Sequence, residues 1–185
     1  MRLETDRVII RDITILDAPD IYEYAKNENV SKTAGFKAHE SIDETISIID
    51  TILKLDTYAI VYKKNNKVIG TICLQKKLDD IYEIGYSLGE EYWNNGIMTE
   101  VIKEILKYAF MEKNAYEIDA GCFLNNLSSQ RVLIKCGFKF MGIHEKDFLN
   151  YDHKYMDAKR YRMLKNDYME VYYGNKIWSQ KSWRE

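Results

Sequence analysis

Apolar residues along the chain follow two spacings, one typical of strands and the other typical of helices. Segment 7–13 alternates in part and is rich in β-branched residues, so it predicts a strand. Segments 57–64 and 67–75 flank the turn-forming pair Asn65 and Asn66, which is the pattern of a β-hairpin. Further strands are predicted over 82–88, 116–123, 138–145 and 154–164.

Helices are predicted where apolar residues recur at every third or fourth position behind a start signal. Such signals begin helices over about 14–26 and after the capping box of 41–44. A longer helix is predicted over 96–113 and a short one over 128–137, ending at a glycine. The buried stripe of the longer helix is Val101, Ile102, Ile105, Leu106 and Ala109.

These elements together predict one α/β (α+β) domain with a mixed sheet. A long helix between two strands favours a parallel, right-handed crossover, so the strands on either side of 96–113 are expected to be parallel. A chain of 185 residues is normally one domain. We expect that domain over 1–165, with a C-terminal helix and aromatic tail over 166–185 that packs on the same domain or on a subunit partner.

Composition narrows the function classes. The net charge of −2 supplies no basic surface and gives no support to nucleic-acid binding. No apolar run approaches membrane-spanning length, and the charged opening MRLETDRVIIRD is unlike a signal peptide. Cys73, Cys122 and Cys136 are odd in number and lack CxxC spacing, which indicates reduced thiols in a cytoplasmic protein. The three histidines lie far apart in sequence, so no metal site is expected.

The turn over 93–99 carries the strongest chemical signal. It follows a strand, contains Gly96 where a backbone can approach a ligand closely, and opens the long helix. The first N–H groups of a helix and its dipole favour an anion at that point. The alternative is an ordinary helix start in which Trp93 anchors the core.

Three segments in this order and spacing, EIGYSL, WNNGIMTE and NLSSQRVLIKCGF, resemble the GNAT superfamily of N-acetyltransferases. With the opening LETDRVIIRD, the resemblance is to the RimJ/RimL-like branch, which acetylates ribosomal-protein N-termini and various other amines. It implies a GNAT-like, strongly twisted mixed sheet of about seven strands flanked by about four helices, with splayed central parallel strands. It also implies acetyl-CoA as the acetyl donor.

The resemblance assigns cofactor roles to two segments and one asparagine. Segment 93–99 matches the pyrophosphate loop, usually Q/R-x-x-G-x-G/A, with Trp93 at the Q/R position and Met98 at the last small position. The strand matching EIGYSL carries a bulge in the family, and its backbone over 86–88 is expected to hold the pantetheine arm and polarise the thioester carbonyl. The residues expected to bind acetyl-CoA are Tyr86, Ser87, Leu88, Trp93, Asn94, Asn95, Gly96, Ile97, Met98, Thr99, Asn126 and Ser129.

Acetyl transfer also needs a neutral amine. At pH 7, deprotonation costs roughly 1 kcal/mol for an α-amine and roughly 4.6 kcal/mol for a lysine, so an α-amine needs only modest help, such as a water. Glu83 lies on the strand where related enzymes often keep a carboxylate, which makes it the general-base candidate. A solvated or salt-bridged strand carboxylate is the alternative.

The leaving thiolate needs a proton. Many superfamily members use a Tyr four residues before the Gly-Phe pair, but this chain has Leu133 there. The RimJ/RimL-like branch tends to carry Ser at the position of Ser129, whose hydroxyl is therefore the candidate acid. Helix capping by Ser128 and Ser129 is the competing explanation. No Ser/His/Asp or Cys/His constellation supports a covalent enzyme, so direct transfer in a ternary complex is favoured.

The sequence thus favours an acetyl-CoA-dependent N-acetyltransferase acting on a primary amine, either a peptide or protein N-terminus or a small molecule. The alternative is a non-catalytic acyl-CoA-binding or sensor module on the same fold. A phosphate-binding enzyme unrelated to CoA is disfavoured because GxGxxG and GxxxxGK[ST] are both absent.

Acceptor specificity is expected to come from segments 15–55 and 144–154. Glu145, Asp147 and Asp152 of the second segment could attract a cationic amine, although a solvated loop has the same composition. Polyamine, aminoglycoside, amino-acid and protein N-terminal acceptors stay open, and both a monomer and a homodimer fit the aromatic tail.

Overall fold

One mixed sheet forms the centre of the protein. The structure, a computed structural model, describes residues 1–52 and 56–181, and side chains as far as Gly174. Within these residues eight strands follow the order β1-β2-β3-β4-β5-β6-β8-β7. The pair β5–β6 is parallel, as predicted, and the other described pairs are antiparallel. The strands are β1 (Arg2–Glu4), β2 (Val8–Asp12), β3 (Thr57–Tyr62), β4 (Lys67–Leu78), β5 (Ile81–Leu88), β6 (Glu117–Phe123), β7 (Lys139–Leu149) and β8 (Tyr155–Leu164).

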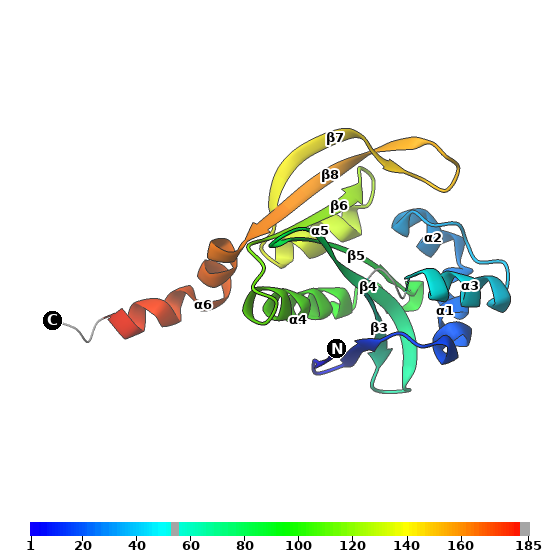
Figure 1. Cartoon of the computed structure of the whole chain (residues 1–185), viewed down its shortest axis with the longest axis horizontal. Helices are drawn as coiled ribbons and strands as arrows, with labels where there is room; N and C mark the ends of the chain where they lie inside the picture. Colours follow the sequence, from blue (N-terminus) through cyan, green and yellow to red (C-terminus); the bar gives the residue numbers. More distant parts are fainter. Residues whose placement is uncertain (53–55, 182–185) are drawn as a thin grey trace.

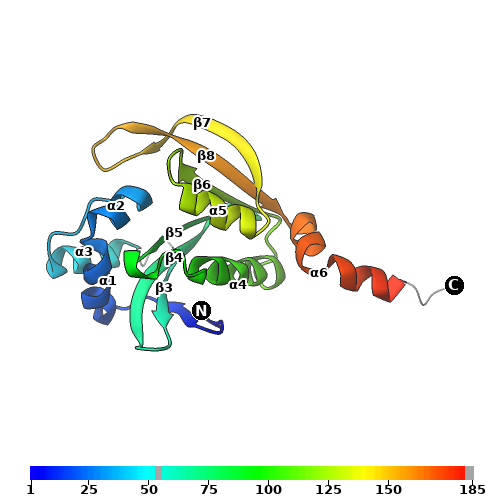
Figure 2. The ribbon, with the colours of Figure 1, turned by 180° about the vertical axis from the view of Figure 1, so that it is seen from behind.

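The helices lie on both faces of this sheet (Figures 1 and 2). They are α1 (Ala18–Ala25), α2 (Glu28–Ala34), α3 (Ile42–Ile52), α4 (Ile97–Met111), α5 (Leu127–Lys135) and α6 (Lys165–Lys181), with short 3-10 turns η1 (Ile15–Asp17) and η2 (Glu90–Tyr92). The single helix predicted to end near Lys26 is followed by a second, α2. The Asn27 side chain caps α2 by accepting from the Asn29 N–H at 2.8 Å, and Gly35 ends it at φ +82°.

Each face of the sheet has its own apolar core. The cluster beneath α4 and α5 includes the whole predicted stripe of α4, Leu133 of α5 and Cys136 directly after α5. The cluster beneath α1 and α3 includes Ile21, Ile49 and Val61. Successive strand residues point to opposite faces, so β5 contributes side chains to both sides of the sheet.

The central strands separate at one end. β5 pairs with β6 from Ile81↔Glu117 to Ile84↔Ala120, and no pairing between these two strands is seen beyond that point. β6 instead continues beside β8 as far as Phe123↔Ala158. The expected bulge is not at 86–88, because β4 and β5 stay in register from Gly70↔Leu88 to Lys76↔Tyr82 and shift only between Lys76 and Leu78. The gap therefore comes from β6 following β8.

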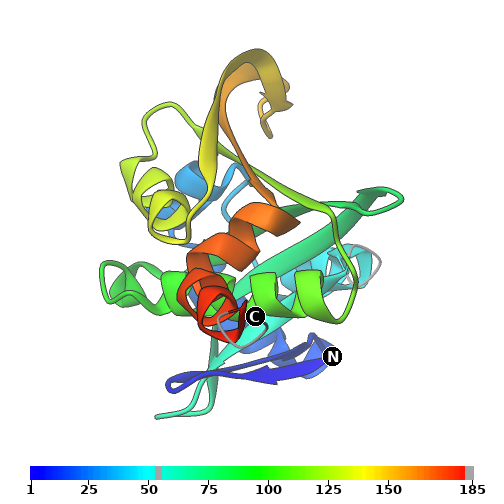
Figure 3. The same cartoon turned by 90° about the vertical axis from the view of Figure 1, so that its left-hand side faces the viewer.

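Helix α6 begins against the domain and then runs away from it (Figures 1 and 2), and Figure 3 looks along the helix from its C-terminal end. Tyr168 is fully buried, its ring 4.9 Å from that of Phe110, and the Tyr172 hydroxyl donates to the Cys136 carbonyl at 2.9 Å. The side chains of Trp178 and Trp183 lie outside the described part. The start of α6 is thus tied to the α4–α5 core, and the division at residue 165 stays a prediction.

Candidate active site

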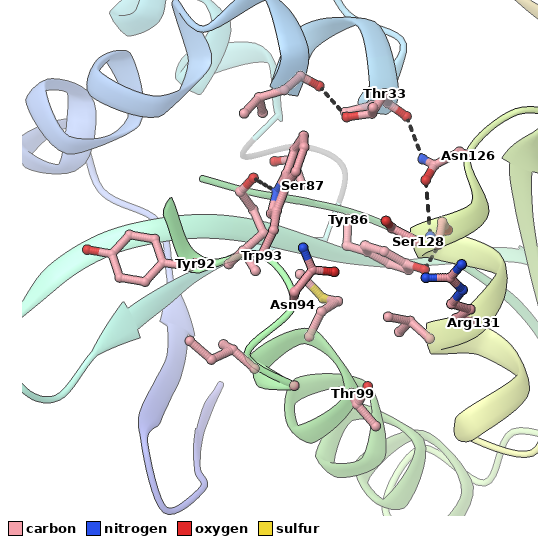
Figure 4. Close-up of a pocket in the computed structure, with 18 of the residues that line it drawn as sticks. Thr33, Tyr86, Ser87, Tyr92, Trp93, Asn94, Thr99, Asn126, Ser128 and Arg131 are labelled. Atoms are coloured by element: carbon pink, nitrogen blue, oxygen red, sulfur yellow. Dashed lines mark hydrogen bonds between the residues drawn. The ribbon is translucent and has the colours of Figure 1, made fainter. Parts of the chain in front are cut away.

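A cavity of about 230 Å³ lies where β5 and β6 separate (Figure 4). Parts of α2, β5, the β5–α4 loop, α4 and α5 meet around it. Its lining residues are Val30, Thr33, Ala34, Tyr86, Ser87, Leu88, Tyr92, Trp93, Asn94, Gly96, Ile97, Met98, Thr99, Asn126, Ser128, Ser129, Arg131, Val132 and Lys135. Of the residues predicted to bind the cofactor, all but Asn95 line this cavity.

The N-terminus of α4 is open toward the cavity. Its N-cap is Gly96 at φ +74°, and no side chain caps the helix. By contrast, Asn126 caps α5 by accepting from the Ser129 N–H at 3.0 Å. The first N–H groups of a helix without a cap need an outside acceptor, and the helix dipole favours a negative one. This end of the cavity therefore fits a phosphate group.

Two residues hold the loop before α4 in place. The Trp93 indole N–H donates to the Leu88 carbonyl at 2.7 Å. Arg7 donates from Nη1 to the Asn95 carbonyl and from Nε to the Glu100 carboxylate, each at 2.7 Å. Asn95 therefore does not line the cavity, but its carbonyl helps to hold the loop through the bond from Arg7. Arg7 was part of the LETDRVIIRD resemblance, but its role was not predicted, since it is 93 residues from Glu100.

Two cations on α5 line the cavity and were missed from the sequence. Arg131 and Lys135 lie one helical turn apart, and Ser128 precedes Arg131 by three positions. Their i, i+3, i+7 spacing within NLSSQRVLIKCGF places the three side chains on one face of a helix, and this was the sequence signal that could have identified them. Both side chains are exposed and add positive charge beside the α4 N-terminus.

The start of α5 joins three elements. Asn126 donates from Nδ2 to the Thr33 carbonyl of α2 at 3.1 Å while its Oδ1 caps α5 (Figure 4). Ser129 is buried, and its hydroxyl lies 2.7 Å from the Tyr86 hydroxyl of β5. Burial raises the pKa of Tyr86 well above its usual value, although the contact with Ser129 lowers it, so the phenol stays protonated. Leu133 is fully buried in the core and does not line the cavity.

Glu83 lies apart from these residues, outside the cavity lining. Its carboxylate pairs with Arg160 and with Lys77, the latter at 2.9 Å. Arg160 also pairs with Asp147 at 2.6 Å and stacks over Phe148 at 5.3 Å. Burial raises the pKa of Glu83, but hydrogen bonds from Lys77 and Arg160 outweigh it, and the net pKa is below the usual value. The carboxylate is therefore ionised at neutral pH and a weak proton acceptor.

The separated parallel strands and the open α4 N-terminus leave a place for a phosphorylated cofactor between two strands. Residues 7–139 match the family model described as acetyltransferase (GNAT) domain. The uncharacterised N-acetyltransferase YoaA of Bacillus subtilis (strain 168) is 36% identical over 150 residues, covering 76% of this chain and 84% of YoaA. The chain therefore belongs to the GNAT acetyltransferase family and is an N-acetyltransferase that uses acetyl-CoA.

Solved structures share the fold. The ribosomal-protein-S5-alanine acetyltransferase of Vibrio fischeri has a TM-score of 0.76 at 21% identity, covering 91% of this chain and 98% of that one. The spermidine N-acetyltransferase of Vibrio cholerae, in complex with CoA and spermine, has a TM-score of 0.74 at 19% identity, covering 89% and 99%. Among the described residues no His, Cys, Asp and Glu side chains are grouped to hold a metal. No described helix is both long and apolar enough to cross a membrane.

Proposed function

We propose that this N-acetyltransferase moves the acetyl group directly from acetyl-CoA to a primary amine in a ternary complex. The amine is that of a peptide or protein N-terminus or of a small molecule. The observation that carries the proposal is the cavity between β5 and β6, which ends at the open N-terminus of α4. It supports binding of an extended cofactor with a phosphate at one end.

The backbone over 86–88 is suited to the pantetheine arm. Its strand, β5, has no partner on the β6 side beyond Ile84 among the described residues, so backbone N–H and C=O groups on that side are open to a ligand. The phosphates would lie at Gly96–Thr99, with Arg131 and Lys135 adding positive charge. Acetyl-CoA supplies the activated acetyl group when bound.

Ser129 is the proposed acid for the leaving sulfur. It lines the cavity beside the backbone of β5, and its own N–H is already capped by Asn126. Asn126 accepts the hydrogen bond from the Ser129 N–H, so the Ser129 hydroxyl is not needed to cap α5. The N-cap of α5 is Asn126, which supports a role for the Ser129 hydroxyl other than capping.

Glu83 has weaker support as a general base. Its lowered pKa and its pairing with Lys77 and Arg160 favour the salt-bridged alternative. An α-amine loses its proton to water at a cost of about 1 kcal/mol at pH 7, so such an acceptor needs no strong base. We infer that Glu83 holds Arg160 in place on the face of the sheet from which the amine acceptor would approach.

The first experiment measures release of CoA thiol from acetyl-CoA with a panel of amines. The panel contains short peptides beginning with Ala or Ser, spermidine, an aminoglycoside and single amino acids, and acetyl-CoA binding is followed by calorimetry. Turnover with one class would identify the acceptor, and absence of acetyl-CoA binding would refute the proposal. Family membership already favours the enzyme over a non-catalytic sensor.

Three variants separate the residue roles. Ser129→Ala should reduce kcat by about 100-fold or more with acetyl-CoA binding intact, because positioned acid–base groups contribute roughly 100- to 10,000-fold. Glu83→Gln should reduce it no more than Asp147→Asn, which removes the other carboxylate from Arg160. A loss of about 100-fold in Glu83→Gln alone would restore Glu83 as the base.

A further inference from the structure

Tyr86 and Ser129 form a hydroxyl pair inside the cavity. Their oxygens lie 2.7 Å apart, although one comes from β5 and the other from the first turn of α5, 43 residues later. A phenol and a serine hydroxyl each have one hydrogen to donate. In a pair of hydroxyls only one hydrogen is used between them, so the other is left for a third group.

A phenol is more acidic than a serine hydroxyl and is the better hydrogen-bond donor, which favours Tyr86 as the donor within the pair. Burial holds Tyr86 in its protonated form at neutral pH. Ser129 lies at the start of α5, beside the other cavity residues Asn126 and Ser128. With the phenol donating to Ser129 Oγ, the hydrogen of Ser129 is not used within the pair and can turn from the neighbouring Cys122 thiol to an acceptor in the cavity.

We propose that Tyr86 is the positioning residue for the acid Ser129: its phenol donates to Ser129 Oγ and directs the Ser129 hydrogen to the CoA sulfur. This inference rests on the proposed function, in which Ser129 serves the sulfur. It explains how a chain with Leu133 in place of the more usual Tyr presents a hydroxyl to the sulfur. A Tyr from the neighbouring strand supports a Ser from the helix.

The proton balance is complete. The amine nitrogen forms the C–N bond to the acetyl carbon, the C–S bond breaks, and its electron pair goes to sulfur. Sulfur takes the proton of Ser129, and Ser129 Oγ regains one that the amine has released, through water in the cavity. Tyr86 keeps its proton throughout and stabilises Ser129 Oγ while that oxygen carries negative charge.

The test uses CoA itself and needs no acceptor. Ultraviolet absorbance of the thiolate reports the pKa of the CoA thiol in the complex, with desulfo-CoA as the reference for each variant. Binding to the wild type should lower this pKa relative to free CoA. Ser129→Ala should raise it by about one unit, and Tyr86→Phe by about half a unit, since a hydrogen bond to a charged sulfur is stronger than one between neutral groups.

A double-mutant cycle decides whether Tyr86 acts through Ser129. Tyr86→Phe should produce no further pKa shift in the Ser129→Ala background, and CoA affinity should change by less than about twofold. Equal shifts in both backgrounds, or an unchanged thiol pKa in all variants that bind CoA, overturn the inference and leave acetyl transfer standing. Failure of the wild type to bind CoA overturns the proposed function instead.

Tyr168→Phe is the matched control for loss of a buried phenol. Tyr168 of α6 is fully buried against Phe110 of α4 and does not line the cavity. It should leave the CoA thiol pKa unchanged even where it lowers stability. A shift equal to that of Tyr86→Phe would mean that the effect is structural and would overturn the inference.

Discussion

Arg7 offers a direct test of how the phosphate end of the site is held. Its side chain donates to the Asn95 carbonyl and to Glu100, each at 2.7 Å, and its backbone N–H donates to Glu100 at 2.9 Å. Asn95 and Gly96 form the loop that opens α4, so Arg7 fixes the orientation of the proposed phosphate-binding N–H groups. Arg7→Gln removes the charge and the fork of donors.

The expected loss follows from these contacts. A hydrogen bond that involves a charged group contributes about 1.5–3 kcal/mol. The Arg7 side chain is 39% exposed, so solvent screening places the effect at the lower end of that range. In the variant, acetyl-CoA must order the loop when it binds, so the lost stabilisation weakens binding. A loss of about 1.4 kcal/mol corresponds to a tenfold rise in the Kd of acetyl-CoA.

Calorimetric titration with acetyl-CoA measures that rise. The kcat at saturating acetyl-CoA should stay within about twofold of wild type, because the residues beside the sulfur are untouched. Arg2→Gln is the control, since Arg2 pairs with Glu4 with both side chains at least half exposed, 60% and 50%. A folded Arg7→Gln protein with the same Kd as Arg2→Gln would refute the reasoning.

Three further changes have outcomes set by local geometry. Leu133→Tyr should lower the free energy of unfolding by about 1–3 kcal/mol without raising kcat, because Leu133 is fully buried; chemical denaturation and turnover check this. Gly70→Ala should cost a similar amount, about 1–3 kcal/mol, since its Cβ would lie 2.4 Å from the Ser87 carbonyl oxygen and must push β4 from β5; no loss on denaturation would contradict it. Burial lowers the pKa of His39 in the folded state although Glu44 raises it, so the unfolded chain binds the proton more readily and stability should fall as pH drops below 6.5. His39→Gln should flatten that fall in melting temperature, whereas the exposed His153→Gln should not; equal slopes would show that His39 is not the cause.

The elements from β5 to α5 were predictable because their sequence signals are local. The α4 stripe repeats at helical spacing, and its members from Val101 to Ala109 are fully buried in the structure. Gly96 and the three residues after it are adjacent in sequence, so their common place at a helix start could be predicted. By contrast, α2 has seven residues and no apolar periodicity, and only its Asn27 cap and the following Gly35 mark it.

The partners of the site residues could not be predicted, because they come from distant parts of the chain. Glu83 was identified as a strand carboxylate, but its pairing with Arg160, 77 residues later, depends on how β8 lies beside β6. The 43-residue separation of Tyr86 and Ser129 is bridged only when α5 packs against β6 and α4 and so brings Ser129 to Tyr86 of β5. Recognising the EIGYSL and NLSSQRVLIKCGF segments therefore does not predict which side chains of these segments contact each other or their distant partners.

The alternation of β5 explains why Glu83 and Ser129 are separated. Tyr82, Ile84 and Leu88 of β5 belong to the core beneath α4, and Tyr86 packs against the same core. Ser87 is on the other face, where its hydroxyl lies 3.1 Å from that of Thr71, and Glu83 shares that face by the period of two. A donor held in the gap between β5 and β6 would thus have the Tyr86–Ser129 pair on one side of the sheet and Glu83 with Arg160 on the other. An amine approaching from the Glu83 face would meet the acetyl carbon opposite the group that serves the sulfur, and direct transfer needs no enzyme nucleophile between them.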